Sequence, residues 1–340
     1  GAYPGTDKQF LGMLGMHGSY EANLAMHEAD LIIAVGARFD DRITGRLDAF
    51  APNSKKIHID IDPSSINKNV VVDLPVVGDV GNVLGQVLST WKSKKLKVNA
   101  KAMKAWWNNI NDWRKKDCLN YDQGNSVIKP QYAIERLYEH TKNLDCYITT
   151  EVGQHEMWAA QFYKFNEPNR WMTSGGLGTM GYGLPSAIGV QVAHPRSLVV
   201  DISGEASFLM NMQEMSTAVQ YRAPVKVFVT NNQYMGMVRQ WQELLHGGRY
   251  AESYTDALPD LVKLAEACQW TGLRAKKPDE VDDVIQEMIE TDRPVIADIW
   301  VDQTENCFPM IPSGAAHNDM LLGPEDEATK PVSEEGMVLV

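Results

Sequence analysis

Near the middle of the 340-residue chain, two oxygen-bearing side chains each follow an apolar run. The run Leu198 to Ser203 leads into Gly204-Glu205, and the run Val225 to Thr230 leads into Asn231-Asn232. Such runs are typical of buried parallel strands, whose carboxyl ends meet at one sheet edge where α/β proteins bind ligands. A carboxylate and an amide oxygen suit Mg²⁺, with phosphate oxygens completing its coordination shell. The pattern therefore predicts a metal–diphosphate site.

The turn after the first of these runs offers a surface for an anion. Gly204-Glu205-Ala206-Ser207 leads into one predicted helix, whose apolar residues recur at helical spacing: Phe208, Leu209, Met212, Met215 and Val219. Backbone N–H groups in such a turn and at a helix N-terminus bind phosphate. Two simpler interpretations stay open. Glu205 can serve the helix dipole alone, and an Asn pair after a strand can be an ordinary turn.

The segment resembles the signature of thiamine-diphosphate-dependent enzymes, which begins Gly-Asp-Gly and ends Asn-Asn after a spacer of this length. From Tyr3 to about His317 the chain is similar to the large, catalytic subunits of the acetohydroxyacid synthase (acetolactate synthase) family. The motifs that carry this resemblance are GMLGMHG (12–18), GARFDDRITGR (36–46), HIDIDP (58–63), GQHEMWAAQ (153–161), TSGGLGTMGYGLPSAIG (173–189) and NNQYMGMVRQWQ (231–242). One departure falls on the metal site, because the family usually has Asp where Glu205 stands.

The resemblance implies a bound Mg²⁺ ion and thiamine diphosphate. The metal ligands would be Glu205, Asn232 and the backbone carbonyl of Tyr234. The residues expected to hold the cofactor are Gly153, Gln154, His155, Gly178, Met180, Gly204, Ala206, Ser207, Asn232, Met235, Gly236 and Met237. The first three of these follow a predicted strand from Cys146 to Thr150. We expect His155 to be a neutral hydrogen-bonding group without a proton-transfer role.

Two residues in the glycine-rich loop would have catalytic roles by resemblance. Met180 would bend the cofactor, and the carbonyl of Gly178 would hold its amino group in the required tautomer; a lone Met is otherwise usually core filler. The activating glutamate of the family is expected in a pyrimidine-binding domain upstream of Gly1. On this interpretation these 340 residues form an incomplete enzyme.

The reaction implied is the first common step of branched-chain amino acid biosynthesis: pyruvate is decarboxylated, and its hydroxyethyl unit is joined to a second pyruvate or to 2-ketobutyrate. The expected substrate-binding residues are Arg42, Met16, Met237 and Trp241. A guanidinium matches a carboxylate bidentately, although Arg42 can instead pair with a neighbouring aspartate. Met237 and Trp241 lie one helical turn apart, and such a pair can equally belong to a core.

Residues 1–90 resemble part of a flavin-binding domain. Apolar runs from Leu31 to Ala37, from Lys56 to Asp62 and up to Val80 predict strands of a doubly wound sheet. The residues expected to contact a structural FAD are Leu14, Gly15, Met16, His17, Gly36, Arg38, Asp40, Asp60, Ile61, Asp79 and Val80. Glycines let the backbone approach a cofactor, and an acid at a strand end can bind ribose hydroxyls. Asp60 can also simply open a turn.

The predicted fold class is α/β, with two doubly wound parallel-sheet domains. The predicted ranges are a partial FAD-binding middle domain (1–90), a basic, Trp-rich helical linker (91–127), a thiamine diphosphate and Mg²⁺ domain (128–318) and a C-terminal tail (319–340). Basic and aromatic residues together can indicate nucleic-acid binding. A solvated helix that packs its tryptophans on a domain is the favoured interpretation of the linker.

The composition narrows the remaining possibilities. The net charge of −12 argues against nucleic acid as the main partner, and the four cysteines show neither metal nor disulfide spacing. Without an apolar run of membrane-spanning length or a signal peptide, we expect a cytoplasmic protein with no membrane partner. The resemblance implies a homodimer or tetramer with active sites at subunit interfaces, and allows an ACT-domain regulatory subunit. The alternatives are a pyruvate oxidase or glyoxylate carboligase type of enzyme, or a non-catalytic cofactor-binding fragment.

Overall fold

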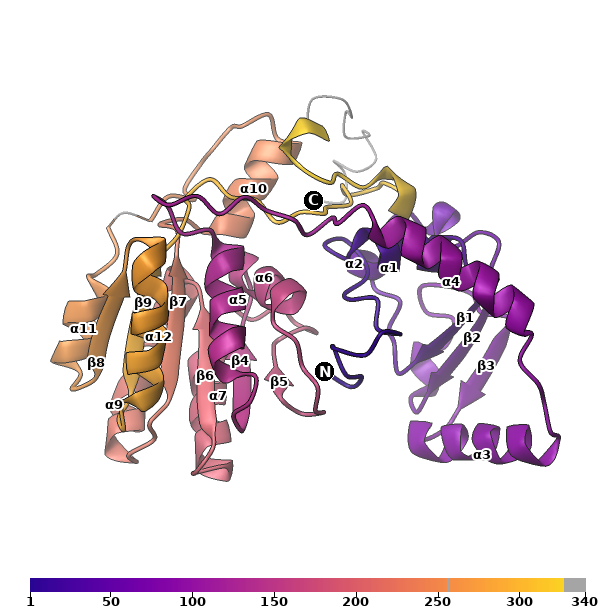
Figure 1. Ribbon diagram of the computed structural model, residues 1–340, viewed down its shortest axis with the longest axis horizontal. Coiled ribbons are helices and arrows are strands. Elements are labelled where there is room, and N and C mark those ends of the chain that lie inside the picture. The colour runs from indigo at the N-terminus through magenta and orange to yellow at the C-terminus, as the bar shows by residue number, and fades with distance from the viewer. Residues whose placement is uncertain (256, 327–340) are drawn as a thin grey trace. The chain divides into compact units, whose positions relative to one another are not determined.

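The computed structural model describes residues 1–255 and 257–326 (Figure 1). The chain divides into two compact units. The larger comprises Gly1–Phe10 and Asn120–Cys307, and the smaller comprises Leu11–Leu119 and the described residues from Phe308 on. Within these ranges each unit contains one parallel sheet, of six and three strands respectively. The predicted α/β class with two parallel-sheet domains is therefore confirmed.

The sheet of the larger unit has the strand order β5-β4-β6-β7-β9-β8, and all its neighbouring strands are parallel. Its strands are β4 (Cys146–Thr150), β5 (Trp171–Met172), β6 (Leu198–Ser203), β7 (Lys226–Asn231), β8 (Thr271–Ala275) and β9 (Val295–Trp300). β4 and β6 have the predicted bounds, and β7 is displaced by one residue. Because β6 and β7 are hydrogen-bonded neighbours, Glu205 and Asn232 follow adjacent strands at one sheet edge, as the sequence predicts.

Helices cover both faces of this sheet (Figure 1). On one face α5 (Pro130–Thr141) packs against α6 (Gln154–Phe162) and α12 (Val281–Glu290), and the short η3 (Pro278–Glu280) precedes α12. On the other face lie α7 (Gly183–Ala193), α9 (Glu214–Gln220) and α11 (Leu261–Ala267). The helices α8 (Glu205–Leu209) and α10 (Gly236–Leu245) begin just after β6 and β7, at the carboxyl edge of the sheet.

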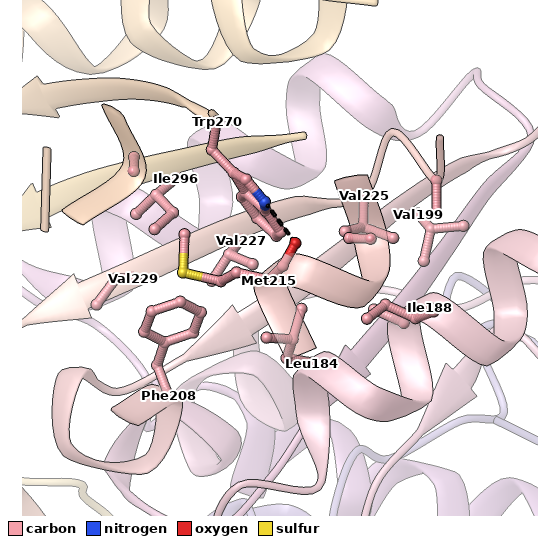
Figure 2. Packing of buried hydrophobic residues seen from close by; sticks show 14 of the residues in the cluster. Leu184, Ile188, Val199, Phe208, Met215, Val225, Val227, Val229, Trp270 and Ile296 are labelled. Atoms are coloured by element: carbon pink, nitrogen blue, oxygen red, sulfur yellow. Dashed lines mark hydrogen bonds between the residues drawn. The ribbon is translucent and has the colours of Figure 1, made fainter. Parts of the chain in front are cut away.

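An apolar core lies between the sheet and α7, α9 and α11 (Figure 2). Alternate residues at the start of and along β7 face it: Val225, Val227 and Val229. The indole of Trp270 is buried in the same cluster, and its Nε1 donates to the carbonyl oxygen of Met215 at 3.1 Å. This close packing fixes the position of β7 in the sheet, and therefore the position of Asn232, which follows it.

The single helix predicted through residues 208–219 is wrong, because the structure has two helices, α8 and α9. Between them the N–H of Asn211 bonds to Phe208 O, three residues back rather than four. The side-chain Nδ2 of Asn211 also donates to the carbonyl of Gly181 at 2.6 Å, which ties this turn to the glycine-rich loop. Phe208 and Met215 are both buried, although they lie on different helices. Their apolar spacing therefore resembles that of a single helix.

The smaller unit is built on β1 (Leu31–Val35), β2 (Lys55–Asp60) and β3 (Leu74–Val77), in that order and all parallel. Its helices are α1 (Tyr20–His27), α2 (Asp41–Thr44), α3 (Val80–Ser93) and α4 (Ala100–Arg114), with short η1 (Leu47–Ala49), η2 (Pro63–Ser65), η4 (His317–Asp319) and η5 (Pro324–Asp326). The predicted strands extend too far at their ends. Asp60 accepts a hydrogen bond from Asp62 N and starts a turn, and Asp79 caps α3 by accepting from Asn82 N.

The Trp-rich segment contributes α4, which packs against α1 within the smaller unit. Trp106 and Trp113 on α4 meet edge to face, with ring centroids 5.6 Å apart, and Ile110 between them is buried. The prediction assigned residues 91–127 to a separate linker, whereas α4 belongs to the smaller compact unit. In the described part of the chain, no helix is long and apolar enough to cross a bilayer.

Candidate cofactor site

A cavity of about 180 Å³ lies in the larger unit, at the carboxyl edge of its sheet. The three predicted metal ligands, Glu205, Asn232 and Tyr234, all line it. So do most of the residues predicted to hold thiamine diphosphate: Gly153, Gln154, His155, Met180, Gly204, Ala206, Ser207, Met235, Gly236 and Met237. Gly178 is not part of the lining. A Cβ at this position would lie 3.7 Å from Val152, and Val152 does line the cavity. The structure thus gathers these residues from distant segments around one cavity.

Three helices begin at this cavity. The N-cap residues of α6, α8 and α10 are Gly153, Gly204 and Met235, and in each case no side chain caps the helix. The first N–H groups of a helix have no acceptor within it, and the helix dipole adds positive potential at the same place. Three such ends around one cavity favour a strongly negative ligand such as a diphosphate.

The predicted metal ligands are buried beside these helix ends. Glu205 is 1% exposed, and burial raises the pKa of its carboxyl group to about 7. Its Oε1 accepts from the hydroxyl of Thr255 at 3.3 Å, and Asn232 Oδ1 accepts from the backbone N–H of Tyr234 at 3.2 Å. A buried carboxylate is costly without a counter-charge, and a divalent cation would supply one.

This donor set fits a hard cation bound together with a phosphate group. It offers one carboxylate, one amide oxygen and one backbone carbonyl, which are oxygen ligands of the kind Mg²⁺ prefers. Across residues 1–255 and 257–326, no three His, Cys, Asp or Glu side chains cluster in a way that could hold a metal ion. A metal at Glu205 and Asn232 would therefore take further oxygens from a bound cofactor or from water.

The imidazole of His155 packs closely against two glycines. A Cβ at Gly153 would lie 2.5 Å from its Cε1, and a Cβ at Gly204 would lie 2.9 Å from its Nδ1, so neither position has room for a side chain. Complete burial lowers the pKa of His155 to about 3, because water cannot solvate the charged ring. His155 is therefore neutral near pH 7, as expected from the sequence, and its hydrogen-bonding role stays a prediction.

Two buried acids that the sequence analysis missed share a hydrogen-bonding partner, and one of them, Glu151, has its Oε1 3.9 Å from His155 Nε2. Glu151 follows β4 and Asp201 lies in β6, and the Oγ of Ser203 is 2.6 Å from Glu151 Oε1 and 2.9 Å from Asp201 Oδ2. A hydroxyl has one hydrogen and can donate to one of these oxygens only. Burial raises the pKa of both acids, that of Asp201 well above its ordinary range. We conclude that one acid keeps its proton and donates it to Ser203. An aspartate inside the apolar run LVVDIS was the available signal.

A buried amide network that the sequence analysis also missed includes one predicted metal ligand, Asn232. Asn232 Nδ2 donates to Gln154 Oε1 at 3.1 Å, and Gln154 Nε2 donates to Gln240 Oε1 at 2.9 Å. Gln240 in turn bonds to both backbone groups of Cys307. Cys307 lies far along the chain from the recognised motifs, so nothing in the motifs pointed to it.

The predicted substrate residues are divided between the two units. Met237 lines the 180 Å³ cavity, and Trp241 lies one turn further along α10. Met16 and Arg42 line a cavity of about 630 Å³ in the smaller unit, together with Asp40 and residues 311–314. Arg42 pairs with Asp41 at 2.9 Å, which is the alternative left open above, but a pair this exposed holds weakly. A shared substrate pocket stays a prediction.

The predicted flavin residues lie around the carboxyl edge of β1, β2 and β3 or in the loop before α1. Met16 and Asp40 line the 630 Å³ cavity, and Arg38 pairs with Asp40 at 3.2 Å. Gly15 has a φ of +97°, and a Cβ there would lie 2.5 Å from the carbonyl oxygen of Arg42, so this position requires glycine. The remaining predicted residues do not line that cavity: Leu14, Gly15, His17, Gly36, Arg38, Asp60, Ile61, Asp79 and Val80.

Comparison with known families matches both parts of the chain. Residues 1–87 match the family described as "Thiamine pyrophosphate enzyme, central domain". Residues 151–299 match "Thiamine pyrophosphate enzyme, C-terminal TPP binding domain", a range that contains the 180 Å³ cavity and its lining. The thiamine diphosphate site expected from the sequence thus coincides with a known cofactor-binding domain.

Individual relatives agree with the family matches. The chain is 49% identical to an acetolactate synthase large subunit from Haemophilus influenzae over 330 residues, which is 97% of this chain and 57% of that protein. It is 48% identical to the large subunit of acetolactate synthase isozyme 3 from Escherichia coli, over 95% of this chain and 56% of that protein. A third relative, from Cyanidium caldarium, is 42% identical over 94% of the chain and 54% of its own length.

The chain thus spans little more than half the length of these relatives. The matched part includes both compact units, and the resemblance seen in the motifs is confirmed over almost the whole chain. The protein is a homologue of acetolactate synthase large subunits and belongs to the thiamine pyrophosphate enzyme family, of which it contains the central and C-terminal cofactor-binding domains.

Proposed function

We propose that this chain forms the cofactor-binding part of an acetolactate synthase. The reaction would decarboxylate pyruvate and join the hydroxyethyl unit to a second pyruvate or to 2-ketobutyrate, the first common step of branched-chain amino acid biosynthesis. The observation that carries this proposal is the single cavity in which Glu205, Asn232 and Tyr234 meet the uncapped N-termini of α6, α8 and α10. The names of the relatives favour this reaction over the pyruvate oxidase and glyoxylate carboligase alternatives.

In the proposed site Glu205, Asn232 and the carbonyl of Tyr234 hold Mg²⁺. The helix N-termini hold the diphosphate, and thiamine diphosphate, when bound, supplies the carbanion chemistry. His155, kept neutral by burial, adds no positive charge and is confined to donating or accepting hydrogen bonds. Met180, which lines the cavity, supplies an apolar surface against which the cofactor can bend.

The smaller unit is proposed to hold FAD in a structural role, since the net reaction transfers no electrons. Support comes from its match to the central domain and from the glycine and aspartate residues at its sheet edge. We further propose that Arg42 and Met16 contact the 2-ketoacid together with Met237 and Trp241. A homodimer or tetramer with active sites at subunit interfaces, an ACT-domain regulatory partner and a cytoplasmic location complete the proposal.

The proposal is tested by assaying acetolactate formation from pyruvate with Mg²⁺, thiamine diphosphate and FAD present. The chain is assayed as it stands and joined to the N-terminal region of the Haemophilus influenzae relative, from which the resemblance leads us to expect the activating glutamate. We expect activity in the joined protein and none in the chain alone. Inactivity of both, with folding and cofactor binding intact, would favour a non-catalytic cofactor-binding fragment.

A further inference from the structure

The side chain of Asn232 can serve a metal ion in only one of its two orientations. Its oxygen is a ligand, whereas its NH₂ group has no lone pair to offer a cation. A rotation of half a turn exchanges the two groups with almost no change of shape. Whatever distinguishes oxygen from nitrogen in the surroundings of Asn232 therefore decides whether the proposed site can bind Mg²⁺.

The backbone of Cys307 provides one such distinction, in addition to the direct bond from Tyr234 N to Asn232 Oδ1, because an N–H can only donate and a carbonyl can only accept. Cys307 N donates to Gln240 Oε1 at 2.7 Å, and Gln240 Nε2 donates to Cys307 O at 3.2 Å. Turning the Gln240 amide over would break both bonds and place like groups against each other. Gln240 is fully buried, so water cannot replace the lost bonds. Its orientation is fixed.

The orientation of Gln154 follows from that of Gln240. Gln154 Nε2 donates to Gln240 Oε1 at 2.9 Å and to the backbone carbonyl of Glu305 at 3.0 Å. An NH₂ group has two hydrogens, and both are used. The oxygen of Gln154 therefore points the other way, towards Asn232.

Gln154 and the backbone N–H of Tyr234 together determine the orientation of Asn232. Asn232 Nδ2 donates to Gln154 Oε1 at 3.1 Å, and the backbone N–H of Tyr234 donates to Asn232 Oδ1 at 3.2 Å. The contact is also sterically closed. A Cβ on Gly236 would lie 2.0 Å from Gln154 Oε1 and 2.8 Å from Asn232 Nδ2, so glycine is needed for the two amides to meet here.

We propose that Gln154 and Gln240 are positioning residues that pass the fixed polarity of the Cys307 peptide to Asn232 and so present its oxygen to Mg²⁺. This inference rests on the proposed Mg²⁺–thiamine diphosphate site. Gln154 lines the cavity, but both of its side-chain N–H groups donate to acceptors within the protein. Gln240 and Cys307 do not line the cavity. Their effect on the metal is therefore indirect. Outer-shell partners of this kind typically change metal affinity about 10- to 100-fold.

The test is a double-substitution cycle on Gln154 and Asn232, read as Mg²⁺ affinity by calorimetric titration in the presence of saturating thiamine diphosphate. Gln154→Met removes the acceptor for Asn232 Nδ2, and we expect Mg²⁺ affinity to fall about 10- to 100-fold. Asn232→Asp has oxygen on both sides, one of which must face Gln154 Oε1, and this repulsion opposes the gain in Mg²⁺ affinity that its negative charge brings. Adding Gln154→Met to Asn232→Asp removes this repulsion, so here the same substitution should raise Mg²⁺ affinity.

That reversal of sign separates positioning from other roles. If Gln154 acted by touching the diphosphate directly, or only by supporting the fold, Gln154→Met would weaken Mg²⁺ binding equally with either residue at position 232. Equal losses would overturn the inference. Complete absence of Mg²⁺-dependent binding by the unsubstituted chain would overturn the proposed cofactor site as well, so the two failures are distinguishable.

Gln191→Met is the matched control. Gln191 is 3% exposed in the same unit, and its Nε2 also donates to two backbone carbonyls, those of His194 and Ser197. It lies outside the cavity lining, so its substitution should lower the thermal midpoint as Gln154→Met does without changing Mg²⁺ affinity.

Gln240→Met should weaken Mg²⁺ binding less than Gln154→Met, because Glu305 O still orients Gln154. A Gln240→Met effect equal to that of Gln191→Met would contradict the relay.

Discussion

The imidazole of His155 lies so close to Gly204 that a Cβ at position 204 would be 2.9 Å from its Nδ1. A Cβ at Gly153 would likewise lie 2.5 Å from Cε1 of the same ring, which is fully buried, so both positions must stay free of a side chain for the ring to keep its place. The two glycines therefore serve to place a neutral histidine at the end of β6, where α8 begins. Both residues line the proposed cofactor cavity.

Gly204→Ala should accordingly disturb the site more than the fold. We expect a loss of stability of about 1–3 kcal/mol from overpacking, and a loss of thiamine diphosphate affinity because His155 and the start of α8 are displaced. Gly189→Ala is the control, since that glycine is exposed in α7 with no atom within 4 Å of an added Cβ. It should stabilise the protein by about 0.5–1 kcal/mol and leave cofactor affinity unchanged. Calorimetric binding and urea unfolding measure both effects, and equal affinity in the two variants would contradict the account.

The proton retained by one of the two acids, Glu151 or Asp201, should make stability depend on pH. Unfolded carboxyl groups ionise near pH 4, whereas burial raises the pKa of both acids in the folded protein. The folded state then holds more protons, so the stabilisation is complete below about pH 4 and is lost as pH rises through the folded pKa values. Asp201→Asn removes one titrating group and gives Ser203 an N–H donor. It should raise the thermal midpoint at pH 8 above that of the unsubstituted chain and flatten the pH dependence. A midpoint that falls more between pH 5 and pH 8 in the variant than in the unsubstituted chain would count against the retained proton.

Mg²⁺ binding should release a proton, because a protonated carboxyl group is a poor ligand. With the pKa of Glu205 raised to about 7, the group is largely protonated at pH 6 and must ionise to bind the metal. Mg²⁺ affinity should therefore increase as pH rises through about 7. Calorimetry in buffers of different ionisation enthalpy should show release of about one proton per Mg²⁺ at pH 6. Glu205→Gln should bind weakly and release none; proton release that persists in this variant would assign it to another group.

The stability of the apolar core between the sheet and α7, α9 and α11 should depend on the indole N–H of Trp270. Trp270→Phe removes the hydrogen bond to Met215 O and part of the ring that fills the cluster shown in Figure 2. We expect a loss of about 1–3 kcal/mol in the free energy of unfolding, measured by urea denaturation. Trp91→Phe is the comparison, because that indole is 44% exposed on α3. It should change stability by less than about 0.5 kcal/mol, and equal losses at the two positions would argue against this view of the core.

The parts of the fold that were predicted correctly depend on local patterns. β4 and β6 matched their predicted bounds because a strand buried on both faces is a short run rich in β-branched and apolar residues. The end of β3 was misplaced because Asp79 caps α3, a role that depends on the helix that follows. The break between α8 and α9 depends on the hydrogen bond from Asn211 to Gly181, thirty residues earlier, which apolar spacing does not register.

The same division holds for the site. Glu205 and Asn232 could be predicted because each follows an apolar strand and neighbouring parallel strands end together. The bond between Gln240 and Cys307 joins residues 67 positions apart, and although Gln240 lies in one of the quoted motifs, nothing in that motif indicates its partner. The pairing of Glu151 with Asp201 likewise requires the register of β4 against β6. The contacts that hold the two predicted ligands in place become visible only once the sheet is formed.

The central claim is that the cavity at the ends of β6 and β7 binds thiamine diphosphate through a metal ion held by Glu205 and Asn232. Its most direct test is calorimetric titration of the chain with thiamine diphosphate, with and without Mg²⁺, repeated on Asn232→Ala. The account predicts saturable binding that requires Mg²⁺ and is lost in the variant while its thermal midpoint stays close to that of the unsubstituted chain. Binding of equal strength without Mg²⁺, or unchanged in Asn232→Ala, would contradict it.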